Sequence, residues 1–184
     1  MRVVGGTAGG RRLAAPTGRK LRPTTERVRE AMFSALESRG LVEGATIADL
    51  FAGTGALGIE ALSRGASAVT FVEADREAVR TVKANLANTG LTGGTVVQAD
   101  VFRFLADMAS GARQPFDLAL VDPPYAFADW DRLLALFPPG LAMFESGREI
   151  AFGEGWEPLR PRRYGGTVVT LARRVQPSSQ SPSA

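Results

Sequence analysis

Short β-rich runs alternate with helical patterns along residues 46–146, and this alternation restricts the fold more than any other feature of the sequence. Strands that alternate with helices are typical of βαβ units, which build a parallel sheet with helices on its faces. At 184 residues, the chain has the size of one domain with a single core. The β-rich runs are TIADLF, VTFVE, TVVQAD, FDLALVD and LAMFES, and the helical patterns lie near 57–64, 76–88, 101–109 and 129–137. The sequence therefore predicts an α/β fold.

The end of the chain predicts an antiparallel hairpin rather than another βαβ unit. Residues 156–174 read as two strands joined through Tyr164-Gly165-Gly166, a glycine-containing turn typical of a hairpin. We therefore expect an antiparallel pair at the edge of the parallel sheet. Residues 175–184 carry no apolar pattern and are predicted to be a disordered tail.

The beginning of the chain is basic. Residues 1–30 hold eight Arg or Lys against two Glu, a local charge of +6, which leaves −3 on the rest. Residues 1–22, punctuated by Gly and Pro, are interpreted as a small basic hairpin or arm rather than a core element. This asymmetry favours a polyanionic partner such as nucleic acid, although a solvated tail would give the same pattern. The predicted phosphate contacts are Arg11, Arg12, Arg19, Lys20 and Arg22.

A helix is predicted directly after this arm, with Thr24 or Thr25 as its N-cap. Arg29, Glu30 and Glu37 are expected on its solvent face. The apolar residues that recur at helical spacing, and are expected to pack on the domain, are Val28, Ala31, Met32, Ala35 and Leu36.

Two missing residue types limit the chemistry. Without Cys the chain can form neither a disulfide nor a thiolate metal site. Without His it lacks the commonest general base and the commonest transition-metal ligand, so we expect no metal and a chemistry based on carboxylates, backbone groups and a cofactor. No apolar run long enough to cross a membrane and no secretory signal are present, which predicts a cytoplasmic protein without membrane contact.

A glycine-rich turn follows the first predicted strand. Gly53 and Gly55 begin a G-x-G-x-x-G pattern that ends at Gly58, and Glu73 lies twenty residues after Gly53. This pattern is the fingerprint of a dinucleotide site, in which the acidic residue binds ribose hydroxyls. The same turn suits S-adenosylmethionine, because its ribose also needs a carboxylate acceptor and close approach of the backbone. The pattern alone leaves both ligands open.

Two further acids favour S-adenosylmethionine. Asp49 lies at the end of the first strand, where its charge would balance an ammonium and a sulfonium but repel a pyrophosphate. Asp100 follows the third strand, where it could accept the adenine amino group while the Val101 N–H meets a ring nitrogen. Each acid alone could instead be a helix N-cap. Together, Asp49, Glu73 and Asp100 end three successive strands, where a doubly wound sheet binds its ligand.

The fourth strand ends in Asp122-Pro123-Pro124-Tyr125. The prolines restrict the backbone and have no N–H, so the Asp122 carboxylate and the Pro123 carbonyl form a rigid group of acceptors. Such acceptors suit the exocyclic amino group of a nucleobase, whose lone pair becomes available for methylation when both N–H groups are bound. Tyr125 offers a surface on which an extruded base could stack, and Asp122 could take the released proton. The structural alternative is a proline turn with a packed tyrosine.

Five stretches together resemble the bacterial ribosomal small subunit methyltransferase D family: LRPTTERVREAMFSAL, DLFAGTGALGIEAL, FVEADREAV, ADVFRFL and LVDPPY. The resemblance covers residues 1–174. It implies a Rossmann-like class I S-adenosylmethionine-dependent methyltransferase fold with a mostly parallel seven-stranded sheet whose last strand is antiparallel, formed by residues 23–174. It also implies methylation of the exocyclic N2 of one guanine, nucleotide 966 of 16S rRNA, within the assembling 30S subunit.

The resemblance also implies residue roles. It assigns cofactor binding to Asp49, Gly53, Gly55, Glu73 and Asp100, with Val101 added from its backbone N–H, and guanine binding to Asp122, Pro123 and Tyr125. A monomer is expected. The alternatives are an amino-methyltransferase acting on another RNA or on DNA adenine or cytosine, a nicotinamide-dependent oxidoreductase, and an RNA-binding factor without catalysis.

Overall fold

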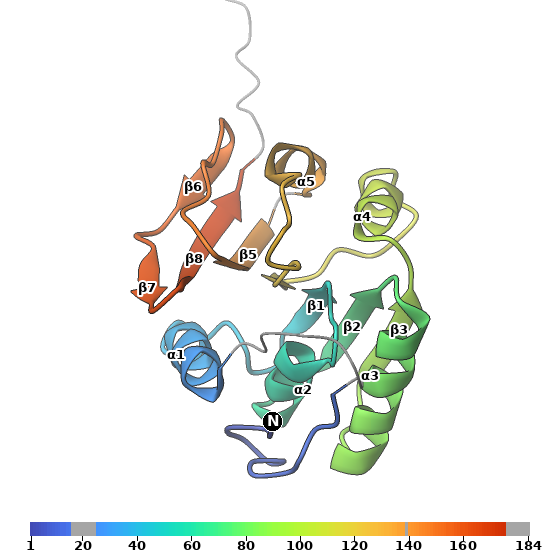
Figure 1. Cartoon of the computed structure of the whole chain (residues 1–184). Helices are drawn as coiled ribbons and strands as arrows, with labels where there is room; N and C mark the ends of the chain where they lie inside the picture. The colour runs from blue at the N-terminus through green and yellow to red at the C-terminus, as the bar shows by residue number, and fades with distance from the viewer. Residues whose placement is uncertain (16–24, 139, 176–184) are drawn as a thin grey trace, which may run out of the picture.

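A computed structural model describes residues 1–15, 25–138 and 140–175 (Figure 1). Helices and strands alternate from residue 46 onward, as the sequence predicts, with bounds within one or two residues of the expected ones. The elements are α1 (Glu26–Glu37), β1 (Thr46–Leu50), α2 (Ala56–Ser63), β2 (Ala68–Glu73), α3 (Arg76–Thr89), β3 (Gly94–Gln98), α4 (Val101–Ala109), β4 (Leu118–Val121), α5 (Trp130–Leu136), β5 (Gly140–Ser146), β6 (Trp156–Pro158), β7 (Arg162–Tyr164) and β8 (Thr167–Arg174). None of the helices in these ranges is long and apolar enough to span a bilayer.

All of these strands form one sheet in the order β3-β2-β1-β4-β5-β8-β6, with β7 also paired to β8. The first five strands in the chain are parallel, and β8 runs antiparallel to β5. The turn at Gly165 and Gly166 joins β7 to β8, which confirms the predicted hairpin and the antiparallel last strand. Gly165 has a φ of 61°, which glycine adopts without strain.

The described sheet holds eight strands, whereas seven were expected. Both β6 and β7 pair with β8, β6 near its end and β7 near its start, so together they fill a single edge position. Pro158 and Pro161 flank the break between them, and neither can donate a backbone hydrogen bond to the sheet. The chain still pairs between the prolines, where the Leu159 N–H donates to the Leu171 carbonyl at 2.8 Å. The sheet thus has seven positions, the last divided between two short strands.

Both faces of the sheet are covered. Successive residues of a strand point to opposite faces, so Ile47 belongs to one apolar cluster and Ala48 to the other. The first cluster packs against α1, α2 and α3, and the second against α4 and α5, as the two groups of helices in Figure 1 show. All four residues of β4 are buried for this reason.

The amino-terminal arm is a hairpin that packs on the domain. Its two sides pair through Arg2 and Arg12, and the Val3 N–H donates to the Arg11 carbonyl at 2.9 Å. Val3, Ala8 and Leu13 are buried in the first apolar cluster. The expectation that the arm lies outside the core is therefore wrong for residues 1–15, because its few apolar residues cover α2. Residues 16–24, with Arg19, Lys20 and Arg22, lie outside the described part, as do the residues of the predicted tail from 176 onward.

Helix α1 begins after Thr25, whose hydroxyl accepts from the Val28 N–H at 3.2 Å, as predicted. The prediction that Arg29 faces solvent is wrong: its side chain is fully buried. Its Nη2 donates to the Arg2 carbonyl at 2.5 Å, and its Nε lies 3.4 Å from Glu60 Oε2. Buried charges need such partners. Because Glu60 lies on α2, the next helix along the chain, the pattern of α1 alone gives no sign of this pairing.

Candidate functional site

Three predicted carboxylates meet at the carboxyl ends of the parallel strands. The strand order β2-β1-β4 brings Glu73, Asp49 and Asp122 to neighbouring positions along one edge of the sheet. They line a common cavity of about 570 Å³, together with Gly53, Pro123 and Tyr125. The structure therefore brings the predicted guanine-binding residues and three of the predicted cofactor-binding residues to one place.

Asp49 is the most buried of these acids, with 1% of its surface exposed. Burial raises its pKa well above the ordinary value, because the charged form loses water. The Gly58 N–H donates to its Oδ2 at 2.9 Å and opposes this rise, whereas the negative charges of Asp122 and Glu73 add to it. The cavity wall is thus strongly acidic, which favours a cationic ligand and disfavours a pyrophosphate.

Glu73 holds the glycine turn in place. Its Oε2 accepts from the Gly53 N–H at 2.9 Å, and its Oε1 accepts from the Asp75 N–H at 2.8 Å. Asp75 in turn caps α3 by accepting from the N–H groups of Glu77 and Ala78. The carboxylate at the end of β2 therefore fixes both the glycine turn and the start of α3.

The glycines of the turn serve different purposes. Gly53 lies on the cavity and has a φ of 56°, which glycine adopts easily. Phe51 also lies on the cavity wall and has a φ of 60°, which is strained for a residue with a side chain. Gly55 is buried at the start of α2 and does not line the cavity. A Cβ there would lie 3.0 Å from Val82 Cγ1. At Gly58 a Cβ would lie 2.3 Å from Phe71 Cε1, so this glycine lets α2 pack closely on β2.

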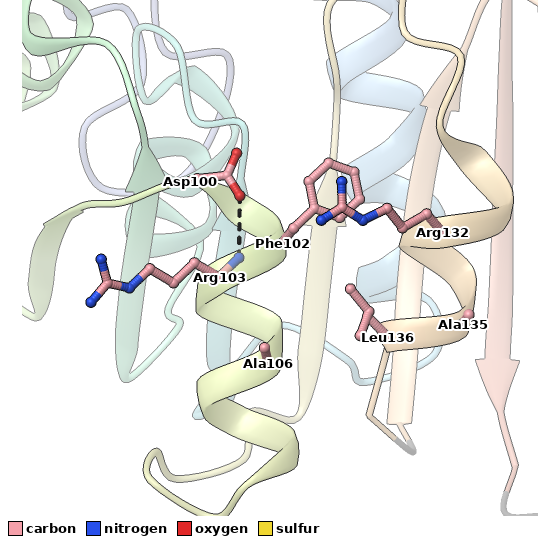
Figure 2. Close-up of a pocket in the computed structure, with 7 residues that line it drawn as sticks. All are labelled: Asp100, Phe102, Arg103, Ala106, Arg132, Ala135 and Leu136. Atoms are coloured by element: carbon pink, nitrogen blue, oxygen red, sulfur yellow. Dashed lines mark hydrogen bonds between the residues drawn. The ribbon is translucent and has the colours of Figure 1, made fainter.

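Asp100 and Val101 lie away from this cavity. Asp100 caps α4, with its Oδ1 accepting from the Arg103 N–H at 3.2 Å, and Val101 is buried. Figure 2 shows Asp100 at one end of a separate groove of about 540 Å³ between α4 and α5, where Arg132 lies 4.2 Å from the ring centre of Phe102. The groove adjoins the cavity, because Phe102 stacks on Phe127, a residue of the cavity wall, at 6.3 Å between ring centres.

Tyr125 is presented at the mouth of the cavity. Its side chain is 77% exposed although it is aromatic. One edge of the ring rests on Gly147, where a Cβ would come within 2.8 Å of Tyr125 Cε2. The preceding turn is closed by the Phe127 N–H, which donates to the Pro124 carbonyl at 2.7 Å. The proline turn therefore holds the ring out beside Asp122 instead of packing it into the core.

Sequence reasoning missed two further parts of the cavity wall. One is aromatic: Phe127 contacts Phe51 and Trp130 edge-on, at 5.3 and 5.0 Å between ring centres. These residues are apolar and resemble core residues in the sequence. The other part lies at the end of β5 and the start of β8, and comprises Glu145, Ser146, Gly147, Arg148, Gly166 and Thr167. The rule that ligands meet strand ends could have indicated the residues after β5.

Arg11, one of the predicted phosphate contacts that the structure describes, lies far from the cavity. Arg11 Nη1 donates to the Asn88 carbonyl at 3.0 Å, near the end of α3. Ala78, near the start of α3, lines the cavity. A helix of this length extends about 21 Å, at about 1.5 Å per residue. Arg12 is exposed on the same hairpin. Within the described ranges, no three Asp or Glu residues gather into a group that could hold a metal ion.

Comparison with known proteins shows the family of this chain. The family model described as Conserved hypothetical protein 95 matches residues 1–173. Ribosomal RNA small subunit methyltransferase D of Haemophilus influenzae is 30% identical over 177 residues, which cover 90% of this chain and 89% of the relative. The protein of the same name from Escherichia coli K12 is 40% identical over 125 residues. The chain belongs to the ribosomal RNA small subunit methyltransferase D family.

The alignment with some members of the methyltransferase D family covers only part of their length. The Escherichia coli alignment spans 68% of this chain and 60% of the relative's length. A solved structure from Escherichia coli, of a protein assigned as a methyltransferase, is 33% identical, with a TM-score of 0.80 over 95% of this chain and 98% of that one. This similarity confirms the predicted α/β methyltransferase fold and the predicted family.

Proposed function

We propose that this chain transfers a methyl group from S-adenosylmethionine to the exocyclic N2 of a guanine in 16S rRNA. The observation that carries the proposal is the Asp122-Pro123-Pro124-Tyr125 turn, which places a carboxylate and an exposed aromatic ring at the mouth of an acidic cavity. Membership of a family whose relatives are named as small subunit rRNA methyltransferases supports the substrate class.

The acidic cavity fits the proposed methyl donor. S-adenosylmethionine supplies an activated methyl group on a cationic sulfonium, so that neither a metal nor a histidine base is required. Asp49 would balance the positive charges of the ligand, and a nearby cation would favour the ionised form that burial now disfavours. Glu73 and the Gly53 backbone would hold the ribose. Asp100 and Val101 would receive the adenine, across the Phe102–Phe127 contact.

The proline turn suits the amino group of the base. The Asp122 carboxylate and the Pro123 carbonyl would accept its two N–H groups and stabilise the positive charge that develops on nitrogen. A new bond forms between N2 and the methyl carbon as the bond from that carbon to sulfur breaks, and Asp122 then takes the proton that N2 loses. Tyr125, exposed beside Asp122, would stack on the extruded base.

The finer assignment completes the proposal. We infer that the target is nucleotide 966, that the substrate is the assembling 30S subunit, and that the enzyme acts as a monomer. A nicotinamide-dependent oxidoreductase fits less well, because the wall of the cavity carries four carboxyl groups, which would repel a pyrophosphate.

Labelled S-adenosylmethionine offered with 30S subunits, free 16S rRNA and duplex DNA tests the proposal. We expect label in N2-methylguanosine, with 30S subunits as the best substrate. Label on DNA adenine, or on no guanine at all, would contradict the proposed activity.

Asp122→Ala tests the mechanism. We expect turnover to fall by about 10²–10⁴-fold, because both an acceptor and the proton acceptor are lost. Cofactor affinity should stay within about twofold by calorimetry. Glu73→Ala is the matched variant and should weaken cofactor binding first, since Glu73 supports the glycine turn. An Asp122→Ala enzyme that keeps most of its turnover would rule out the acceptor mechanism.

A further inference from the structure

Arginines gather where the carboxyl edge of the sheet meets the antiparallel hairpin. Arg148 follows β5 and lines the cavity, one residue after the Gly147 on which Tyr125 rests. Arg162 and Arg163 lie on β7, the neighbouring edge strand. All three side chains are exposed. We refer to Arg148, Arg162 and Arg163 as the arginine rim.

The strand register places the rim at the cavity. Gly166 and Thr167, at the start of β8, line the cavity, and Thr167 pairs with Tyr164. Arg163 pairs with Val168 and Arg162 with Val169. At about 3.3 Å per residue, both arginines begin within two or three residues of the cavity wall. Being consecutive in β7, they point to opposite faces of the sheet and border this end of it from both sides.

The charged side chains of the antiparallel hairpin region are all positive. From Pro158 to Val175 the sequence contains five arginines and neither Asp nor Glu. Two of the five, Arg173 and Arg174, lie at the far end of β8, where Arg174 packs over Trp156. Glu149 pairs with the rim: its Oε1 lies 3.6 Å from Arg163 Nη2, and both side chains are more than half exposed. Such an exposed pair is weak and leaves the guanidinium available to a stronger anion.

Arg11 of the amino-terminal arm is less well placed than the rim to hold the strand around a target base, although Met1 and Ala15 of the arm line the cavity. Arg11 is bonded to Asn88 at the far end of α3, about 21 Å from the cavity end of that helix. Figure 1 shows the arm beside the far end of α3, with β7 and β8 at the opposite edge of the sheet, next to α1. Arg148 lies beside the ring of Tyr125, where a stacked base would bring its phosphates close.

We propose that the arginine rim binds the phosphates that flank the methylated base. This inference rests on the proposed function, because it takes the occupant of the cavity to be an RNA base. Arginine suits the task, since its planar guanidinium binds phosphate oxygens in pairs.

Charged residues on an edge strand can also serve only to prevent sheet-to-sheet association. That role predicts aggregation when the charges are removed, with no change in RNA binding. The two roles therefore differ in what they predict for RNA affinity and for its salt dependence.

The test measures binding of in-vitro-transcribed 16S rRNA and of 30S subunits, without methyl donor, at several salt concentrations. The triple variant Arg148→Gln, Arg162→Gln, Arg163→Gln should bind at least tenfold more weakly, and its salt slope should fall by about 2, because fewer counterions are released. The control Arg39→Gln, Arg80→Gln, Lys83→Gln removes the same charge from exposed positions elsewhere. It should bind like the wild type, and Arg11→Gln with Arg12→Gln should lose less affinity than the rim variant.

Two readouts separate the possible causes. Glu149→Gln breaks the same ion pair as Arg163→Gln but makes the rim more positive, so RNA binding should be kept or tightened; a loss would overturn the proposal. The urea-unfolding midpoint should be unchanged in the rim variant, as a check on folding. An unchanged salt slope in the rim variant, or an equal loss in the control, would also overturn it. If the wild type methylates RNA while the rim variant binds normally, only this inference fails; if the wild type methylates no RNA, the proposed function fails.

Discussion

Asp49 occupies a position where a carboxylate is costly unless a positive charge binds beside it. Its side chain has lost nearly all contact with water, and two neighbouring acids oppose its ionisation. Among the described residues, the Gly58 N–H compensates in part by donating a hydrogen bond to it. A residue of this kind lowers the stability of the ligand-free fold and strengthens the binding of a cation, a trade that is typical of functional sites.

The first prediction concerns Asp49→Asn. Because the folded-state pKa of Asp49 is raised, its contribution to stability is present at low pH and is lost as the pH rises through that raised value. Asparagine keeps an oxygen for the Gly58 N–H but has no charge. The ligand-free variant should therefore be more stable than the wild type at pH 8, by on the order of 1 kcal/mol in urea unfolding, and the gain should shrink at pH 5.

Asp117→Asn is the control for this prediction. The N–H and hydroxyl of Thr46 lower the pKa of Asp117, so its stabilising effect is present at neutral pH and is lost as the pH falls. This variant should be less stable than the wild type at pH 7. If the Asp49→Asn protein is less stable than the wild type at pH 8, the ionised Asp49 carboxylate stabilises the ligand-free fold, and the prediction is wrong.

At the scale of elements, the ends of several helices could be predicted because their signals are local. The acceptors that cap α1, α3 and α4 are Thr25, Asp75 and Asp100, each one residue before the helix. Arg29 could not be placed in this way. Its neighbours in the sequence suggest a solvent face, whereas its partner Glu60 comes from another helix.

As with the helices, only part of the candidate site could be predicted from the sequence. Parallel strands share a carboxyl edge, so Asp49, Glu73 and Asp122 could be brought together from the sequence. The distance of Asp100 from the cavity, and the wall that Arg148 supplies, depend on where helices and loops direct their side chains. That information comes from packing between distant parts of the chain.

The close packing of α2 on β2 leads to a prediction for Gly58→Ala. On helix propensity alone, alanine should stabilise α2 by about 1 kcal/mol. The added Cβ would, however, lie 2.3 Å from Phe71 Cε1 and 2.8 Å from Val69 Cγ1, both in the core. Overpacking of this kind costs about 1–3 kcal/mol or more, so a net loss of stability is expected in urea unfolding. Gly153→Ala is the control, because its added atom meets nothing within 4 Å, and it should change stability little. If the Gly58→Ala and Gly153→Ala proteins are equally stable, α2 can shift to make room for the added methyl group.

At the scale of the whole molecule, buried charges join the amino-terminal arm to the domain beside the cavity. Glu60 on α2 is fully buried and accepts from the N–H groups of Val4 and Gly5, both at 2.7 Å. It also pairs with Arg29 of α1 and with Arg64. Met1, at the start of the arm, lines the cavity. One carboxylate thus connects the arm, α1 and α2, and the position of the arm at the cavity depends on it.

Glu60→Gln tests this connection. The amide has no charge, so the buried Arg29 loses its ion pair with residue 60 while keeping its bond to the Arg2 carbonyl. The NH2 group of the new side chain would face the N–H donors of the arm. Removing one member of a buried ion pair costs about 3–5 kcal/mol, and the variant should unfold at lower urea by that amount. Hydrogen exchange should show faster exchange at Val4 and Gly5 than in the wild type, with a smaller change in β4. Glu37→Gln removes an exposed partner of Arg64 and should cost less than about 1 kcal/mol. If the two variants are equally stable and the arm exchanges as in the wild type, the arm is held by its apolar contacts, Val3, Ala8 and Leu13, and the buried charges only fix the geometry of α1 against α2.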